Sequence, residues 1–306
     1  MGRISLETLQ LAARVRSSGS RLVLVSGTRY STFVNRLPFL PRADAYVIEN
    51  GGRVFYPKEA VSQGGEAKQA DGNTGSDSAG SSAVGDPALT GHPAAALTED
   101  LKWREQMESV TGPAAQDVKD PTDREGPLWD LYRRAVAEGF EVDTNTYYTM
   151  LRIKVKTGNS KKRSRDAAEG GDGGEEEQGG EEEEEKGGEA AMKRLLDSLP
   201  PGLLVVTNFG MVDICPERSG KHNAAAYLAK EHFGISLEEC ASMGDDDNDI
   251  ALANTMGKGA FITTFSSESV EAAAKANPQR FTVAKAEGVG SSEEMLRLIL
   301  ASCPSS

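Results

Sequence analysis

The sequence predicts an α/β fold: a parallel β-sheet core into which a smaller α+β unit is inserted. Near both ends of the chain, short apolar runs alternate with amphipathic stretches, which is the pattern of a parallel sheet whose strands are connected by helices. The middle of the chain has strand-like alternation of polar and apolar residues instead. Two low-complexity stretches interrupt this middle part. We therefore expect one sheet made from both ends of the 306-residue chain, with an insert between them.

The first block starts with apolar positions at helical spacing and continues with an apolar run that is ended by Ser26-Gly27, which indicates a helix followed by a buried strand. A second helix ends before Pro38, and the next strand is stopped by the turn Asn50-Gly51-Gly52. The expected elements are helices at 6–17 and 30–37 and strands at 21–25, 45–48 and 54–56.

The insert and the last block are divided in the same way. In the insert we expect helices at 128–138 and 190–199, strand-like alternation over 140–155, and strands at 203–207 and 212–215. In the last block we expect helices at 222–233, 250–256, 269–276 and 292–302 and strands at 240–243 and 260–262. The predicted domains are a core of residues 1–56 and 208–306 and a cap of residues 57–207.

The two low-complexity stretches, about 61–97 and 157–190, are expected to be disordered surface insertions. They are rich in Gly, Ser, Ala and acidic residues and cannot bury enough apolar surface to offset their chain entropy. The basic run 161–165 is typical of a solvated segment beside acidic sequence, and a nuclear-import signal is the alternative.

Composition excludes several classes of protein. The net charge is −13, of which −7 falls between Lys161 and Glu189 (12 acidic and 5 basic residues), so the rest carries about −6 and no nucleic-acid partner is expected. No apolar stretch approaches the ~20 residues of a membrane helix, and the first residues lack the apolar block of a signal peptide. The three cysteines are widely spaced, which argues against disulfides or a zinc site and favours a reducing, cytoplasmic location.

The strongest functional signal is the acidic turn Gly244–Asp249, which lies between an expected strand and an expected helix. It has four aspartates in five residues, beside Asn248, and such crowded carboxylates are stabilised by a shared hard cation, which predicts a magnesium site. The alternative is a solvated turn that caps the next helix. A calcium loop of the EF-hand type is excluded, because Ile250 and Met256 stand where Gly and Glu are required.

Two further sites could bind phosphate. Ser219-Gly220-Lys221 places an ammonium at the start of a helix, and a plain surface lysine is the alternative. Ser26-Gly27 follows a buried strand, so its hydroxyl and backbone N–H groups could face a phosphate oxygen, although such sequences are also common in ordinary turns. Ser26 is not expected to be a nucleophile, because it has neither a Gly-x-Ser-x-Gly frame nor an evident histidine partner.

Taken in order, the motifs Ser26–Arg29, Ile48–Gly52, Gly220-Lys221 and Gly244–Asp249 resemble the haloacid dehalogenase superfamily. The Glu-Asn-Gly-Gly turn and the Gly-Asp-x-x-Asn-Asp-Ile signature are similar to its Cof-like, sucrose-phosphatase-like and mannosyl-phosphoglycerate-phosphatase-like branch. The resemblance covers most of the foldable chain. It implies a Rossmann-like core, an inserted α+β cap, and hydrolysis of phosphate monoesters through an aspartyl-phosphate.

The resemblance also implies roles for individual residues. Lys221 would stabilise charge in catalysis and bind phosphate together with Ser26, Gly27 and Asn248. The magnesium cofactor would be held by Asp245 and Asp249, with the assistance of Asp246. The substrate would be a small phosphorylated metabolite, for which a phosphosugar is the expected class.

One part of the family pattern has no counterpart here. The family's nucleophile lies in an Asp-x-Asp motif at the end of the first strand, but the first aspartate of this chain is Asp44. Asp123-Arg124-Glu125 imitates the motif, but it follows a segment that cannot form a buried strand.

We expect that the core lacks its first strand and that the recorded sequence starts downstream of the true start. In that case a plastid or another organelle is an alternative location. The alternative function is a catalytically inactive protein that binds a phosphorylated metabolite or a partner.

The substrate itself cannot be derived from the motifs. Trp103, Trp129, Tyr132 and Tyr147 fall in the expected cap and could contact a sugar, but such aromatic residues are more typical of its apolar core. The oligomeric state also leaves no pattern in the sequence.

Overall fold

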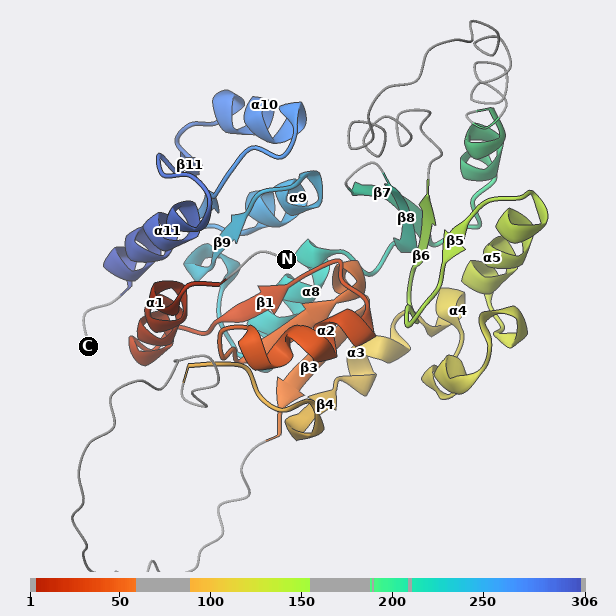
Figure 1. Cartoon of the computed structure of the whole chain (residues 1–306), viewed down its shortest axis with the longest axis horizontal. Helices are drawn as coiled ribbons and strands as arrows, with labels where there is room; N and C mark the ends of the chain where they lie inside the picture. Colours follow the sequence, from red (N-terminus) through yellow and green to blue (C-terminus); the bar gives the residue numbers. More distant parts are fainter. Residues whose placement is uncertain (1–3, 59–88, 155–187, 189, 209–210, 304–306) are drawn as a thin grey trace, which may run out of the picture.

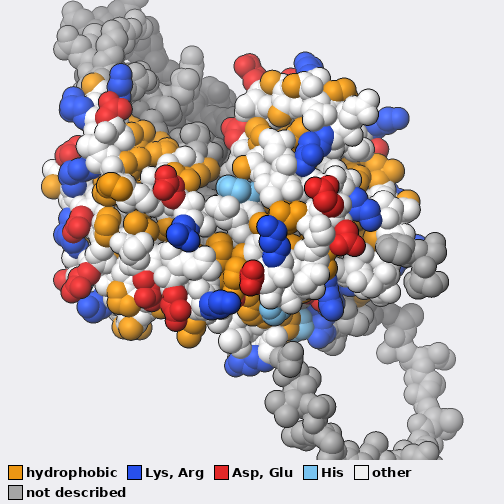
Figure 2. Space-filling model, turned by 180° about the vertical axis from the view of Figure 1, so that it is seen from behind, with side chains coloured by type: hydrophobic (Ala, Val, Ile, Leu, Met, Phe, Trp, Pro, Cys, Tyr) orange, Lys and Arg blue, Asp and Glu red, His pale blue; other side chains and the backbone are white. Residues whose placement is uncertain are grey.

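The structure is a computed structural model that describes residues 4–58, 89–154, 188, 190–208 and 211–303. The described residues form two small sheets, which make up the core, and a separate antiparallel sheet, which belongs to the cap (Figure 1). This arrangement confirms the predicted α/β class with an α+β cap. On the face shown in Figure 2, side chains of both charge signs are interspersed.

The first sheet contains the three strands of the amino-terminal block and a fourth strand from the predicted cap range, in the order β1-β2-β3-β4. The strands are β1 (Val23–Val25), β2 (Ala45–Ile48), β3 (Arg53–Pro57) and β4 (Leu97–Glu99). β1 and β2 are parallel, with Val23 opposite Ala45, and β3 and β4 continue the sheet in antiparallel pairing. Every residue of β2 is buried, as expected for a strand that is covered on both faces.

The second sheet contains three parallel strands from the last block, in the order β11-β10-β9. They are β9 (Ala241–Gly244), β10 (Gly259–Ile262) and β11 (Phe281–Val283). The prediction of one continuous parallel sheet is therefore wrong for the described residues, because β1 and β9 are each an edge strand and do not pair. Their side chains instead line a common cavity, where a strand that would join the two sheets is not present among the described residues.

Helices cover the sheets and connect them. The helices of the core are α1 (Leu6–Ser17), α2 (Tyr30–Arg36), α8 (Lys221–Tyr227), α9 (Asp247–Thr255), α10 (Glu268–Ala276) and α11 (Val289–Ser302), and α8 continues as a π-helical turn over Leu228–His232. α1 packs against α11, and α8 packs against α9. α1 belongs to the block of the first sheet, and α8 leads out of the cap. Their partners, α11 and α9, belong to the block of the second sheet.

The cap is a four-stranded antiparallel sheet in the order β5-β6-β8-β7, with β5 (Val142–Asp143), β6 (Leu151–Lys154), β7 (Leu203–Asn208) and β8 (Met211–Pro216). Helix α5 (Pro127–Ala137) and a helix over residues 190–197 pack on it, with Leu128, Trp129 and Leu131 at the centre of the apolar cluster. Shorter helices lead from the first sheet into the cap. They are α3 (Leu101–Glu105) and α4 (Glu108–Thr111), with 3₁₀ turns at Ala114–Val118 and Pro121–Asp123.

The remaining 3₁₀ turns lie at Leu37–Phe39, Glu49–Gly51, Ala94–Ala96 and Leu237–Glu239. No described helix combines the length and the apolar character needed to cross a membrane.

The division into core and cap at residues 57 and 207 stays a prediction. Strand pairing places β4, from the predicted cap range, in the first sheet, and β8, from the predicted core range, in the cap sheet. Most of the two segments predicted to be disordered, and the basic run 161–165, lie outside the described residues. The described end of the first segment is ordered, because Thr90 bridges to Pro41 and the chain then enters β4.

Candidate active site at the carboxyl ends of β1 and β9

All seven residues that the sequence assigns to the site line one cavity of about 910 Å³ between the two core sheets. They come from three places in the chain, namely the end of β1, the start of α8 and the turn between β9 and α9. The residues are Ser26, Gly27, Lys221, Asp245, Asp246, Asn248 and Asp249. Because the carboxyl ends of parallel strands collect loops at one edge of a sheet, motifs far apart in the sequence meet here.

Lys221 connects the parts of the site. Its ammonium donates to Asn248 Oδ1 at 2.5 Å and to Asp249 Oδ1 at 2.7 Å. The side chain is only 8% exposed, so this ion pair is screened little by solvent. The alternative of a plain surface lysine is therefore wrong.

Asp249 also organises the acidic turn. Its second oxygen, Oδ2, accepts from the backbone N–H groups of Asp245 at 3.3 Å and Asp246 at 3.4 Å. Asp246 and Asp249 form a capping box, which is why α9 starts at Asp247, three residues before the predicted start at Ile250. The helix-capping interpretation of the turn is thus confirmed for these two carboxylates.

Asp245 takes no part in the capping box of α9. Burial raises its pKa, the nearby Asp249 and Asp246 carboxylates raise it further, and the Lys221 ammonium lowers it. A cation beside Asp245 would remove this cost of holding a negative charge.

The fit of the turn to a metal ion can be judged from its donors. Among the described residues, no group of three Asp, Glu, His or Cys side chains is placed to hold a metal. Mg²⁺, however, usually needs only one or two protein carboxylates together with water and phosphate oxygens. Asp245, with Asp249 as second ligand, suits that demand, and a metal cage built by three carboxylates is not what the structure shows.

Ser26 is placed by the pairing of β1 with β2. Its backbone N–H donates to Val47 O at 2.9 Å, and its carbonyl accepts from Asn50 N–H at 3.3 Å. The hydroxyl accepts from Thr28 N–H at 3.2 Å, which closes a small turn around the end of the strand. The hydroxyl therefore lies at the carboxyl end of β1, on the cavity wall.

The turn Glu49–Gly52 fixes Lys221 relative to Ser26. Glu49 and Asn50 have positive φ angles of 52° and 53°, and the Asn50 carbonyl accepts from Gly220 N–H at 2.7 Å. At Gly51, with φ of 96°, an added Cβ would lie 2.3 Å from Gly220 O. The turn therefore requires glycine at this position, where two backbones touch. The sequence showed the turn as a family signature but did not reveal this supporting role.

The same turn is tied to the cap. Glu49 Oε2 accepts from Tyr148 N–H at 2.9 Å and from Thr149 N–H at 2.7 Å. Burial raises the pKa of Glu49, although Arg53 and these hydrogen bonds lower it. The Asn50 amide donates to Asp213 Oδ2 in β8 at 2.9 Å. Core and cap are thus joined through two residues of one turn.

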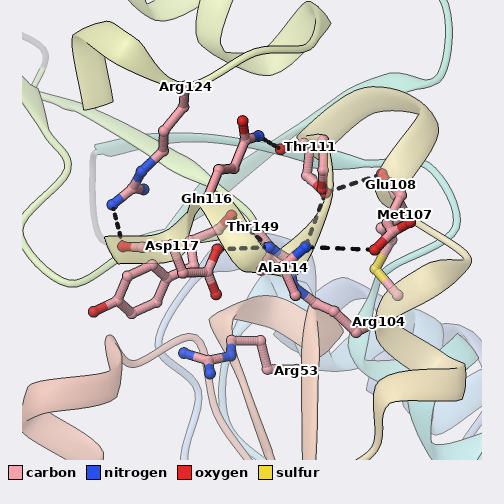
Figure 3. A network of polar contacts seen from close by, with 12 residues as sticks. Arg53, Arg104, Met107, Glu108, Thr111, Ala114, Gln116, Asp117, Arg124 and Thr149 are labelled. Carbon is pink, nitrogen blue, oxygen red and sulfur yellow. Dashed lines mark hydrogen bonds and ion pairs between the residues drawn. The ribbon is translucent and has the colours of Figure 1, made fainter. Parts of the chain in front are cut away.

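A buried polar network supports this junction (Figure 3). Arg104, which is 1% exposed, donates to Asp117 at 2.9 Å and to Thr111 at 2.8 Å. Arg124 donates to the Asp117 carbonyl at 3.0 Å and, like Arg53, stacks on the Tyr148 ring. Arg124 therefore has a structural role. The motif 123–125 that imitates an Asp-x-Asp sequence lies at a 3₁₀ turn and not at a strand end.

The aromatic residues considered for sugar contact are mostly core. Trp129 is fully buried in the cap, with Tyr132 packed beside it. Trp103 packs in the core under the first sheet, and its indole N–H donates to Gly51 O at 2.9 Å. Tyr147 lines the cavity.

Two arginines at the site were not found from the sequence. Arg29 and Arg152 also line the cavity, next to Tyr147, whose ring contacts both guanidinium groups. Arg152 comes from the cap strand β6, and it has no motif around it that could have identified it. Arg29 stood within the Ser26–Arg29 motif but received no role.

Comparison with known proteins agrees with this geometry. Residues 181–286 match the family model of the haloacid dehalogenase-like hydrolases. No curated protein matches the sequence. Among solved structures, the chain is similar to the sucrose-phosphatase of Synechocystis sp. PCC6803 in complex with sucrose and phosphate, with a TM-score of 0.56 and 15% identity, over 96% of this chain and 90% of that chain.

A second similar structure is a protein of Thermoplasma acidophilum, with a TM-score of 0.51 and 11% identity, over 97% of this chain and 90% of that chain. At these identities the likeness concerns the fold. The family model covers the second part of the site, from Lys221 to Asp249, and the fold extends over nearly the whole chain. The resemblance seen in the motifs is thereby confirmed: residues 181–286 match the model of the haloacid dehalogenase-like hydrolases, and the chain shares its fold with these two solved structures.

Proposed function

We propose that this chain binds the phosphate group of a small phosphorylated metabolite, with Mg²⁺, and forms that part of a phosphate monoester hydrolase. The observation that carries the proposal is the cavity that reaches the carboxyl ends of β1 and β9, which is lined by Ser26, Lys221 and Asp245. A hydroxyl and an ammonium suit phosphate oxygens, and a carboxylate suits the cation that accompanies them.

The residues would act through position and charge. The buried Lys221 ammonium would stabilise negative charge on the phosphoryl oxygens, and the Ser26 hydroxyl and the Gly27 N–H would orient them. Asn248 would hold both the loop and Lys221, to which it is already bonded. Mg²⁺, held by Asp245 and Asp249 with Asp246 close by, would supply charge neutralisation when bound.

A phosphosugar is the substrate class that we favour. Arg152 reaches the cavity from the cap strand β6 and Arg29 from the core segment after β1, and their guanidinium groups carry hydrogen-bond donors, which suit a polyhydroxylated group. The similar structure from Synechocystis is a sucrose-phosphatase in complex with sucrose and phosphate, which agrees with this choice at the level of fold.

The attacking carboxylate is not assigned to a residue of this chain. The first aspartate of the sequence, Asp44, lies at the amino end of β2, where it accepts from Leu22 N–H at 2.9 Å and pairs with Arg16. It is thus at the opposite end of the sheet from the cavity residues Ser26 and Lys221. Asp44 is therefore not placed to attack a phosphate in the cavity, and a phosphate-binding protein without turnover is the second candidate function.

Calorimetry with inorganic phosphate and Mg²⁺ tests the proposal. Since charge-assisted hydrogen bonds contribute about 1.5–3 kcal/mol, Lys221→Ala should weaken phosphate binding by roughly 10–150-fold. Lys275→Ala is the matched control, because that lysine is 72% exposed and its Glu271 pair lies on α10. Equal affinities of the two variants would refute the assignment of the site.

Turnover distinguishes the two candidate functions. Release of p-nitrophenol from p-nitrophenyl phosphate by this chain with Mg²⁺ would support the hydrolase and contradict the expectation that the nucleophile is missing. Phosphate binding without release is the result expected here.

A further inference from the structure

Two arginines that line the cavity contact one tyrosine ring. Arg29, at the start of α2, has its guanidinium carbon 5.1 Å from the centre of the Tyr147 ring, and Arg152, in the cap strand β6, has its own at 5.5 Å. All three residues line the cavity, and Tyr147 has no solvent exposure. We call Arg29, Tyr147 and Arg152 the arginine wall.

The first arginine of the wall is paired with a carboxylate of the cap. Arg29 donates through Nη1 to Asp143 Oδ1 at 3.2 Å and through Nη2 to Asp143 Oδ2, and Nη1 also donates to the Asn145 carbonyl at 3.4 Å. The side chains of Arg29 and Asp143 are 24% and 19% exposed, so water screens this pair less than it screens a surface pair. The positive charge of Arg29 is therefore matched by one negative charge beside the wall.

The second arginine is paired more deeply. Arg152 donates from Nε to Asp213 Oδ1 at 2.6 Å and from Nη2 to Asp213 Oδ2 at 2.7 Å. The side chain of Arg152 is 13% exposed, and that of Asp213 is not exposed at all. A bidentate pair of this kind has a fixed geometry, and separating it would leave a buried charge without a partner. Arg152 is therefore held by Asp213.

The third cation at this end of the cavity is Lys221, and it too is matched by a carboxylate, that of Asp249. Asp245 and Asp246 add negative charge to the same end, and the proposed Mg²⁺ would balance it. The cavity wall near the proposed phosphate site thus has cations for one phosphate group and its metal ion, and its two arginines are already neutralised.

Three further cations line the cavity among the described residues, but they lie toward the amino ends of the strands. Arg21 precedes β1, Lys258 precedes β10, and Arg36 is the last residue of α2, the helix that leads back from the carboxyl end of β1. They are therefore remote from Ser26 and Lys221 and do not change the charge balance there.

This balance affects the part of a ligand that carries no phosphate. Hydroxyl groups can accept hydrogen bonds from a guanidinium group whether or not a carboxylate neutralises it. A second anionic group gains little beside a neutralised guanidinium and still loses its hydration, which is costly at a site shielded from water.

We propose that the arginine wall makes this site selective for phosphorylated compounds whose remainder is uncharged. A polyhydroxylated compound with one phosphate group is bound in preference to the same compound with a second anionic group, either a carboxylate or another phosphate. The inference rests on the proposed function, because it requires that the phosphate group binds beside Ser26 and Lys221.

The first test compares two ligands that differ at one carbon atom. Sorbitol 6-phosphate ends in a CH₂OH group, where 6-phosphogluconate has a carboxylate. In calorimetry with Mg²⁺, the wild type should bind sorbitol 6-phosphate about tenfold more tightly, which corresponds to an added desolvation cost of about 1.4 kcal/mol. Tighter binding of 6-phosphogluconate by the wild type would overturn the proposal.

The second test gives Arg29 an unmatched charge. Asp143→Asn keeps the shape of the side chain and the acceptor that Asn145 N–H uses at 3.1 Å, but it removes the negative charge. The tenfold difference between the two ligands should fall to about onefold, because the carboxylate of 6-phosphogluconate now gains a charge-assisted hydrogen bond. A looser cap would change both affinities alike, so the ratio of the two affinities reports the charge.

Asp130→Asn is the matched control. It removes the carboxylate of another arginine pair, that with Arg133, on the surface of α5, where the Asp130 side chain is 69% exposed. The ratio of the two affinities should stay at the wild-type value in this variant.

A titration with inorganic phosphate and Mg²⁺ separates the inference from the proposed function. If phosphate binds and Asp143→Asn leaves the ratio unchanged, or if Asp130→Asn changes it equally, the selective role of the wall is refuted and the phosphate site remains. If the wild type binds neither phosphate nor sorbitol 6-phosphate, the proposed function is refuted and the inference falls with it.

Discussion

The contact between Gly51 and Gly220 leads to a prediction that can be worked out from geometry. Gly51→Ala adds a Cβ that would lie 2.3 Å from Gly220 O and 2.5 Å from Gly220 C. The added atom also stands on a residue whose φ of 96° is unfavourable for any L side chain. Both penalties arise from backbone atoms, which cannot swing aside as a flexible side chain could.

The expected loss of stability is the sum of these two penalties. A left-handed conformation costs about 1–2 kcal/mol, and overpacking at a site that cannot relax costs about 1–3 kcal/mol. Gly51→Ala should thus lower the free energy of unfolding by about 2–5 kcal/mol. Gly139→Ala is the matched control, because its φ is 86° and its Cβ would meet nothing within 4 Å, so it should show only the first penalty.

Urea unfolding followed by circular dichroism measures both variants. Phosphate calorimetry on the folded Gly51→Ala protein gives a second measurement, since a shift of Gly220 would move Lys221. If both variants lose the same stability, the close approach of the two backbones is not as described and the reasoning fails.

Three further predictions concern single contacts. The pKa of Asp44 is raised by burial but lowered more strongly by Arg16, Leu22 N–H and Arg21, and lies below its ordinary 3.8. The Asp44 carboxylate therefore contributes stability above that pH and loses it as the pH falls through its lowered pKa. The advantage of the wild type over Asp44→Asn in thermal unfolding should shrink below pH 3.8, and a constant difference would contradict this. Trp103→Phe leaves Gly51 O unpaired and should cost about 1–3 kcal/mol in urea unfolding, whereas no change would exclude the indole bond. Ser5→Ala removes the cap of α1 and should cost about 1 kcal/mol by the same measurement, and an unchanged midpoint would argue against the cap.

Several elements of the fold could be predicted because their signals are local. The helix Leu6–Ser17 and the strand Ala45–Ile48 have the predicted bounds, since a capping serine and a turn mark their ends. β11 (Phe281–Val283) was missed, because three residues are too few to show a period. β4 was missed because it follows a low-complexity stretch and is stabilised by pairing with β3, which is a tertiary contact.

That the candidate site residues lie around one cavity could be predicted, whereas their bonds could not, and their functional roles stay predictions. Residue type and order brought Ser26, Lys221 and the acidic turn together, as the common cavity confirms. That Asp249 is used by Lys221 and by two backbone N–H groups depends on distances that no spacing reveals. Likewise, the run 21–25 is typical of a paired strand, and only the structure shows that one of its edges has no partner among the described residues.

The carboxylate of Asp213 restricts how the cap could move. It lies in β8 with no solvent exposure and accepts from Asn50 of the core at 2.9 Å and from Arg152 of β6 at 2.6 Å. Separating β8 from the turn Glu49–Gly52 would leave buried polar groups without hydrogen-bond partners. Breaking a buried ion pair costs about 3–5 kcal/mol. The cap is also held by the hydrogen bonds from Tyr148 and Thr149 N–H to Glu49 and by the Arg29–Asp143 ion pair, so it is expected to keep its position on the core, and with it the place of Arg152 beside the cavity.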